Sequence, residues 1–157
     1  MVRIVEAPEI YSNPYKTTLF LAGGITNCPD WQKELIDILT HTKYDGEFLQ
    51  DLIIYNPRRK NFPIDIPGES ERQITWEYDY LKSSDIISFW FSRGSLNPIV
   101  LYELGMWGNS SDTPIVIGMD PEYERKTDVI IQTKLARPAI RIVYSLVDMA
   151  NEIAKAI

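Results

Sequence analysis

The chain has 157 residues and a formal net charge of −6, and 45% of its residues are hydrophobic and 11% aromatic. This size and composition suit one globular domain with a substantial core, so we expect a single domain over residues 1–157 and no extended disorder. The negative charge argues against nucleic acid as a partner, because phosphate binding needs a basic surface. No apolar run is long enough to cross a bilayer and no signal peptide is recognisable, so we expect no membrane partner.

Cysteine usage points to the cytoplasm. Cys28 is the only cysteine, so a disulfide framework is excluded and a cytoplasmic protein is expected. The only histidine, His41, lies at the far end of the helix that Cys28 precedes, so we expect no Cys–His mechanism. No cluster of His, Cys and Asp has metal-ligand spacing, so we predict no metal.

Apolar runs alternate with helical patterns after a polar lead-in, residues 1–16, for which no element is predicted. Strands are predicted at residues 17–22, 52–55, 85–91, 114–118 and 139–144. Two helices are predicted from helical spacing, one from Trp31, Leu35, Ile38 and Leu39 and one from Ile74, Tyr78 and Leu81. Further helices are predicted after Pro98 and over residues 128–135. The last is predicted after Ser145, which forms a capping box with Asp148. This alternation predicts an α/β fold: a flavodoxin-like, doubly wound, five-stranded parallel sheet of strand order 2-1-3-4-5, with helices on both faces.

In this strand order the first and third strands are neighbours, and the ligand crevice lies at their carboxyl ends. Gly23 and Gly24 follow the first strand. The loop after the third strand leads to Asn97, the expected N-cap of a helix whose second turn contains Glu103. A carboxylate in this apolar segment must face a partner, water or a ligand. We therefore expect Glu103 to lie beside the glycine pair. The alternatives are a solvated or salt-bridged residue for Glu103 and a tight strand-to-helix turn for the two glycines.

Other polar and aromatic side chains are candidates for the same crevice. Asn56 and Arg58 follow the second strand and could bind a sugar hydroxyl or a phosphate, unless they form only a surface turn. Glu77 is either a ligand contact or a solvated helix residue, and Trp76 is either core or a platform for a planar base. Asp85, at the amino end of the third strand, is expected to be a structural cap. Neither a G-x-G-x-x-G motif nor a P-loop is present, so we expect no cofactor.

Several segments between residues 17 and 118 form a recognisable series in their order and spacing. They are Leu21-Ala22-Gly23-Gly24-Ile25, Tyr55-Asn56-Pro57-Arg58, Gln73-Ile74-Thr75-Trp76-Glu77, Leu81 to Asp85, and Tyr102-Glu103-Leu104-Gly105. Together they resemble the nucleoside 2-deoxyribosyltransferase-like family, and a further stretch from Ile131 to Pro138 resembles one branch of that group.

The resemblance implies that Glu103 is a nucleophile that attacks the anomeric carbon of a 2′-deoxynucleoside and expels the base. A second base, or water, then takes the sugar, which is double displacement with retention. It also implies that Glu77 protonates the leaving base or orients the sugar, and that Gly23 and Gly24 line the sugar pocket near Asn56. Relatives complete their sites with a neighbouring subunit, so a homo-oligomer is implied.

Two departures from the family pattern leave two alternative functions open. Asn97 stands where relatives with transferase activity often carry Asp, and Ile99 stands in place of a glycine. One alternative is an N-glycosidase that hydrolyses deoxynucleoside 5′-monophosphates, with Arg58, Arg59 or Arg93 on the phosphate. The other is a non-catalytic module that binds a nucleotide-like ligand.

Overall fold

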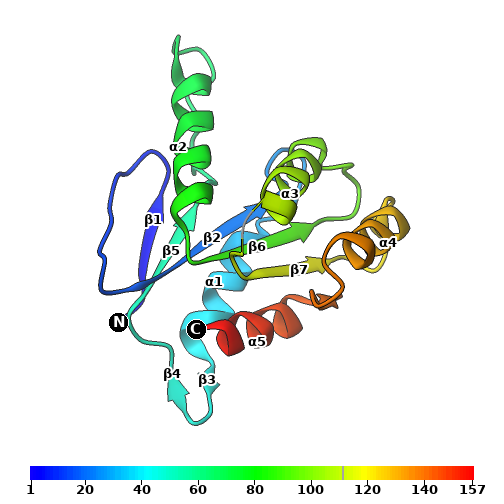
Figure 1. Ribbon diagram of the computed structural model, residues 1–157. Coiled ribbons are helices and arrows are strands. Elements are labelled where there is room, and N and C mark those ends of the chain that lie inside the picture. The colour runs from blue at the N-terminus through cyan, green and yellow to red at the C-terminus, as the bar shows by residue number, and fades with distance from the viewer. Residues whose placement is uncertain (111) are drawn as a thin grey trace.

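The computed structural model describes residues 1–110 and 112–157 and has an α/β fold around a six-stranded parallel sheet (Figure 1). The strand order is β1-β5-β2-β6-β7-β8. The sheet strands are β1 (Arg3–Glu6), β2 (Thr17–Gly23), β5 (Leu52–Asn56), β6 (Ile86–Phe91), β7 (Ile115–Met119) and β8 (Ile142–Val143). A separate antiparallel pair, β3 (Lys43–Tyr44) and β4 (Glu47–Phe48), lies outside this sheet.

In the part of the chain that the structure describes, five helices cover the two faces of the sheet. They are α1 (Trp31–His41), α2 (Glu69–Ser83), α3 (Pro98–Ser110), α4 (Lys126–Ala136) and α5 (Leu146–Ala156). Alternate residues of the strands supply two cores, as the period of a strand requires. Phe20 and Ala22 of β2 pack into the core under α2, α3 and α4, whereas Leu19 and Leu21 pack into the core with α1 and α5.

The predicted strand order is confirmed, because the five predicted strands correspond to β5-β2-β6-β7-β8. The number of strands differs, because residues 1–16 supply a sixth strand. In β1, Arg3 pairs with Ile53 and Glu6 with Asn56 on the outer side of β5. The last predicted strand is shorter than expected, since only Ile142 and Val143 pair with β7.

The helical face predicted for α2 was wrong at Ile74 and Tyr78, although Leu81 is buried as expected. Ile74 and Tyr78 are 66% and 47% exposed, whereas the buried residues of this helix are Gln73, Trp76, Tyr80 and Leu81. The aromatic rings of Trp76 and Tyr80 pack against each other, with centroids 4.6 Å apart, and both pack on Tyr55 of β5. The aromatic cluster of Trp76, Tyr80 and Tyr55 therefore lies on the buried side of α2.

Candidate active site

A cavity of about 300 Å³ lies at the carboxyl end of β2, on the face of the sheet that α2 and α3 cover. This is the place that the strand order predicts, because β2 and β6 are neighbours there and their following loops diverge. Its volume is at the lower end of the range of small-molecule sites, about 300–1,000 Å³. Its wall consists of Phe20, Ala22, Gly23, Gly24, Ile25, Thr26, Pro57, Glu77, Ser95, Asn97, Pro98, Ile99, Val100 and Glu103.

Gly24 and Asn97 bring the two loops of the cavity together. A Cβ atom on Gly24 would collide with Asn97 Oδ1 and would lie 2.6 Å from Cys28 Sγ, so the close approach requires glycine. Asn97 is 3% exposed and has a left-handed backbone with φ of 50°, which asparagine tolerates better than most residues.

The Asn97 side chain is held by its own loop. Its Nδ2 donates to the carbonyl oxygens of Ser92, at 3.2 Å, and Ser95, at 3.0 Å. An aspartate carboxylate could not make these two bonds, because it accepts hydrogen bonds and does not donate them. The amide at position 97 is thus suited to hold this loop, which explains in physical terms why this chain has Asn there.

Glu103 is the carboxylate that the sequence places at this crevice, and it lies on the cavity wall. Among the residues that the structure describes, it has neither a hydrogen-bond partner nor an ion-pair partner. Burial raises the pKa of Glu103 to about 8, and the negative charge of Glu77 adds to the increase. The salt-bridged alternative considered from the sequence does not hold for this glutamate.

Glu77 of α2 faces the same cavity. Gln73, one turn earlier, donates from Nε2 to Glu77 Oε1 at 2.7 Å and to the carbonyl oxygen of Pro57 at 2.8 Å. Burial raises the pKa of Glu77, although the hydrogen bond from Gln73 opposes the increase. The cavity therefore contains two carboxyl groups whose surroundings favour protonation, a pattern that is typical of acid–base and nucleophilic sites.

Three sequence-predicted site residues lie off the cavity wall. Asn56 is buried, and its Oδ1 accepts from the backbone N–H of Arg58 at 3.0 Å. The Arg58 guanidinium donates to the carbonyls of Cys28 and Pro29 and to Gln32 Oε1. Trp76 is 5% exposed within the core and donates from Nε1 to the Glu9 carbonyl. These contacts connect the three residues to the protein rather than to the cavity.

The sequence predicts that the loops of Thr26 and Ser95 flank the crevice, but it did not single out these two residues, or Pro57, as site residues. Thr26, Pro57 and Ser95 line the cavity, and each belongs to a loop that follows a predicted strand. The signal was present, because every residue just beyond the carboxyl end of a strand near the switch point is a candidate. What the sequence lacks is a pattern that tells which loop side chains turn inward.

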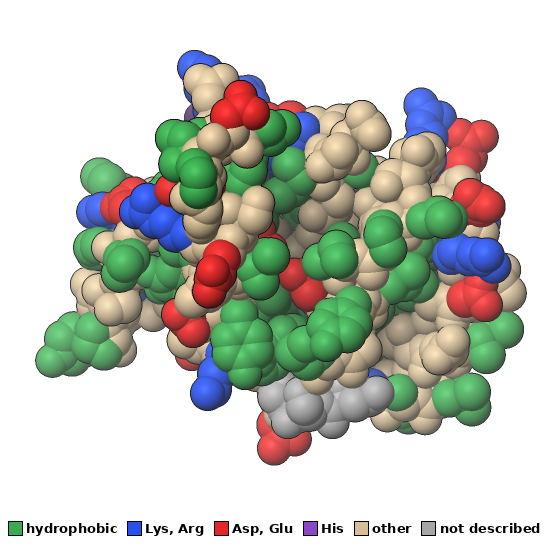
Figure 2. All heavy atoms as spheres, turned by 90° about the horizontal axis from the view of Figure 1, so that it is seen from above, with side chains coloured by type: hydrophobic (Ala, Val, Ile, Leu, Met, Phe, Trp, Pro, Cys, Tyr) green, Lys and Arg blue, Asp and Glu red, His purple; other side chains and the backbone are tan. Residues whose placement is uncertain are grey.

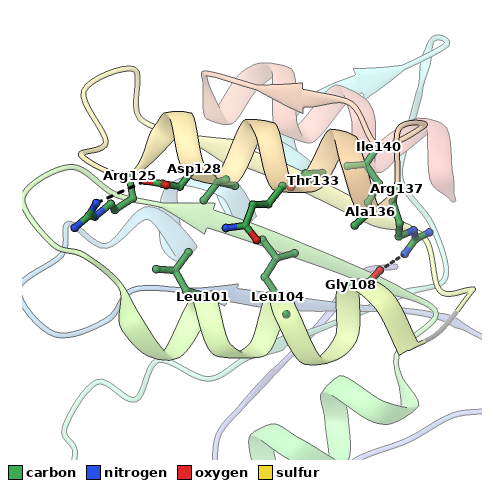
Figure 3. Close-up of a pocket in the computed structure, with 12 residues that line it drawn as sticks. Leu101, Leu104, Gly108, Arg125, Asp128, Thr133, Ala136, Arg137 and Ile140 are labelled. Carbon is green, nitrogen blue, oxygen red and sulfur yellow. Dashed lines mark hydrogen bonds and ion pairs between the residues drawn. The ribbon is translucent and has the colours of Figure 1, made fainter.

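A larger hollow, of about 440 Å³, lies between α3 and α4 (Figure 3). Leu101 and Leu104 form its α3 side, opposite Val129, and they do not line the cavity of Glu103. Its charged groups are engaged at both ends, since Arg125 pairs with Asp128 and Arg137 donates to the carbonyl of Gly108. This hollow is a weaker candidate for chemistry, because it contains no unpaired acid or base among the described residues.

Two features are absent from residues 1–110 and 112–157. No helix in these ranges is long and apolar enough to cross a membrane. No three His, Cys, Asp or Glu side chains in them are grouped so that they could hold a metal ion.

Comparison with known proteins identifies the family. The family model described as "Nucleoside 2-deoxyribosyltransferase like" matches residues 16–123, more than half of the chain. No curated protein matches the chain. A solved structure, a conserved protein from Enterococcus faecalis V583, superimposes with a TM-score of 0.65 at 16% identity over 90% of this chain and 99% of its own, which supports the fold alone. The cavity and its two glutamates thus lie within the matched region, and the chain belongs to the nucleoside 2-deoxyribosyltransferase-like family.

Proposed function

We propose that this protein cleaves the N-glycosidic bond of 2′-deoxynucleosides, with Glu103 as the nucleophile, and transfers the deoxyribosyl group to an acceptor base. The observation that carries the proposal is the unpartnered carboxylate of Glu103 in a cavity between the glycine pair and Glu77. Membership of the family adds nucleoside chemistry to this geometry. A carboxylate suits the reaction, because an adjacent anion stabilises the oxocarbenium-like transition state.

In the first step a Glu103 oxygen bonds to C1′ as the bond from C1′ to the base breaks. The electron pair of that bond goes to the base, and Glu77 supplies the proton that the base takes up. The acceptor base then attacks C1′, returns its proton to Glu77 and releases Glu103, with overall retention. Gly23 and Gly24 leave space for the sugar close to the backbone.

This sequence of steps requires one proton on the pair of glutamates, with Glu103 ionised and Glu77 protonated. Burial raises both pKa values, and that of Glu103 reaches about 8, so the pair retains a proton at neutral pH. Two coupled carboxyl groups titrate as a unit, and the proton can reside on either. Positive charge that develops on the sugar favours the ionised form of Glu103, and we expect it to shift the proton to Glu77.

The arginines give a reason to prefer a nucleoside over its 5′-monophosphate. No Lys, Arg or His is on the cavity wall among the described residues. Arg58 is engaged by three oxygens, Arg59 pairs with Glu69 at 2.7 Å and Arg93 pairs with Glu122 at 2.6 Å. A phosphate beside two carboxyl groups would therefore lack a countercharge. We expect thymidine to be a better substrate than thymidine 5′-monophosphate.

We also propose a homo-oligomer that covers the cavity mouth. Large apolar side chains of α2 and α3 are exposed, including Ile74, Tyr78, Ile99 and Tyr102, and Ile99 also lines the cavity. Figure 2, which looks onto this end of the molecule, shows hydrophobic side chains gathered over α2 and α3. Contiguous apolar patches of this kind mark contact surfaces. Tyr102→Asp should lower the mass measured by light scattering, and a wild-type protein that runs as a monomer would contradict the proposal.

The test of the proposed function is intact-mass analysis after mixing with a deoxynucleoside. We expect a deoxyribosyl adduct that peptide mapping places on Glu103 and that free adenine discharges to 2′-deoxyadenosine. The same experiment on Glu103→Ala should give no adduct. Turnover whose rate and products do not depend on added base would favour the hydrolase. Ligand binding without adduct or turnover would favour the binding module.

A further inference from the structure

Gln73 is buried beside the cavity, with 9% of the residue exposed. Its amide nitrogen makes two hydrogen bonds, to Pro57 and to Glu77, whereas its Oε1 is buried without a partner among the described residues. An unpaired buried amide oxygen costs free energy. The orientation of this amide must therefore be stabilised by the two bonds that its nitrogen makes.

These bonds fix which atom of Gln73 faces Glu77. The carbonyl of Pro57 can only accept, so the nitrogen and not the oxygen must point toward it. The same nitrogen then donates to Glu77 Oε1, at 2.7 Å. When Glu77 is protonated, its carbonyl oxygen is a better acceptor for this N–H than its hydroxyl oxygen. The hydrogen bond to Oε1 therefore favours the proton on Oε2.

We infer that Gln73 is a positioning residue, which holds Glu77 so that its acidic proton is on Oε2 and available to the leaving base. The inference rests on the proposed function, in which Glu77 Oε2 gives its proton to the base as the Glu103 oxygen bonds to C1′ and the base departs with the electron pair. Without Gln73, either oxygen of Glu77 can carry the proton, and the carboxyl group is free to turn.

The experiment compares two substrates that differ in their need for an acid. 2′-Deoxyadenosine requires a proton on its leaving base, whereas 7-methyl-2′-deoxyguanosine already carries a positive charge and releases a neutral base. We expect Gln73→Met to lower kcat/KM for 2′-deoxyadenosine at least about tenfold more than for the methylated substrate, since general-acid catalysis contributes about 10²–10⁴-fold. Spontaneous loss of the methylated base is subtracted.

The ratio of the two rates is measured on one sample, so a fraction of unfolded protein cancels from it. Gln132→Met is the matched control: it makes the same chemical change at an exposed position of α4, away from the cavity, and should leave the ratio unchanged. In a Glu77→Gln background, Gln73→Met should produce no further change in the ratio, because the acid is already absent.

Equal losses on both substrates would show that Gln73 only supports the fold, which would overturn the inference and leave the proposed function intact. A further change of the ratio in the Glu77→Gln background would also overturn it. If the wild-type protein turned over neither substrate, the proposed function would fail, and the inference with it.

Discussion

Acidic side chains at the two ends of the β2–β6 pair have opposite surroundings. At the amino end, Asp85 Oδ2 accepts from the backbone N–H and the hydroxyl of Thr18, at 2.8 and 2.7 Å, and the Asp85 N–H donates to the same hydroxyl. At the carboxyl end, Glu103 lies in a cavity without a partner among the described residues. A paired carboxylate thus stabilises the fold, whereas an unpaired one is retained at a cost to stability, as a functional group can be.

The largest expected effect separates the two ends by chemistry. Glu103→Gln should lower kcat/KM on a deoxynucleoside by about 10³-fold or more, because an amide cannot form the glycosyl intermediate. Asp85→Asn makes the same exchange of carboxylate for amide at the other end of the sheet, so its kcat/KM per folded molecule should stay within a few-fold of wild type. Steady-state kinetics on both variants test this, and similar losses would show that Glu103 and Asp85 do not differ in function.

The second effect is on stability, and it has the opposite sign. The pKa of Glu103 is raised from 4.5 to about 8 in the folded protein. Between these pH values the folded state therefore binds more protons than the unfolded state, and the stability of the protein falls as pH rises from 4.5 to about 8. Glu103→Gln should therefore be more stable than wild type, by roughly 2 kcal/mol at pH 8.5 after allowance for solvent screening, with little gain near pH 4.5. Urea unfolding at both pH values measures the difference, and a gain that does not change with pH would contradict the explanation.

The third effect is a loss of stability at the amino end. Asp85→Ala removes the acceptor of the Thr18 N–H and hydroxyl and should lower the free energy of unfolding by about 1–2 kcal/mol. Urea denaturation measures this loss. The matched control is Asp128→Ala, which removes an exposed carboxylate whose partner Arg125 is 3.7 Å away, and it should cost less than about 0.5 kcal/mol.

The strands of this molecule could be predicted from the sequence more completely than its side-chain contacts. Strand order followed from the alternation of apolar runs, and strand order alone brings Gly24 and Glu103 to one crevice. β1 was missed because residues 1–16 have no clear alternation, although Arg3 to Glu6 pair along the edge of β5. The sequence does contain a signal for the β3–β4 hairpin, the Asp45-Gly46 turn, where both residues have positive φ.

Side-chain partners were harder to predict than the position of the site. Arg58 follows a strand at the correct edge of the sheet, yet its guanidinium is occupied by the loop before α1. Gln73 is polar, and only the packed structure reveals that it is buried and bonded to Glu77. Such pairings depend on tertiary distances that neither period nor residue type encodes.

The smallest expected effect is a shift in the midpoint of the pH–rate profile. It tests the electrostatic interaction between Glu103 and Glu77 in the cavity. The leaving base of 7-methyl-2′-deoxyguanosine needs no proton, so kcat/KM for this substrate should depend only on the ionisation of Glu103. It should rise with pH to a plateau, with a midpoint near the pKa of about 8. Glu77→Gln removes the neighbouring negative charge, which raises the pKa of Glu103, so the midpoint should move to lower pH. It should remain above the ordinary value of 4.5, because burial is the larger cause of the increase and is retained in the variant. An unchanged midpoint would mean that the two glutamates do not interact, and each would then titrate alone.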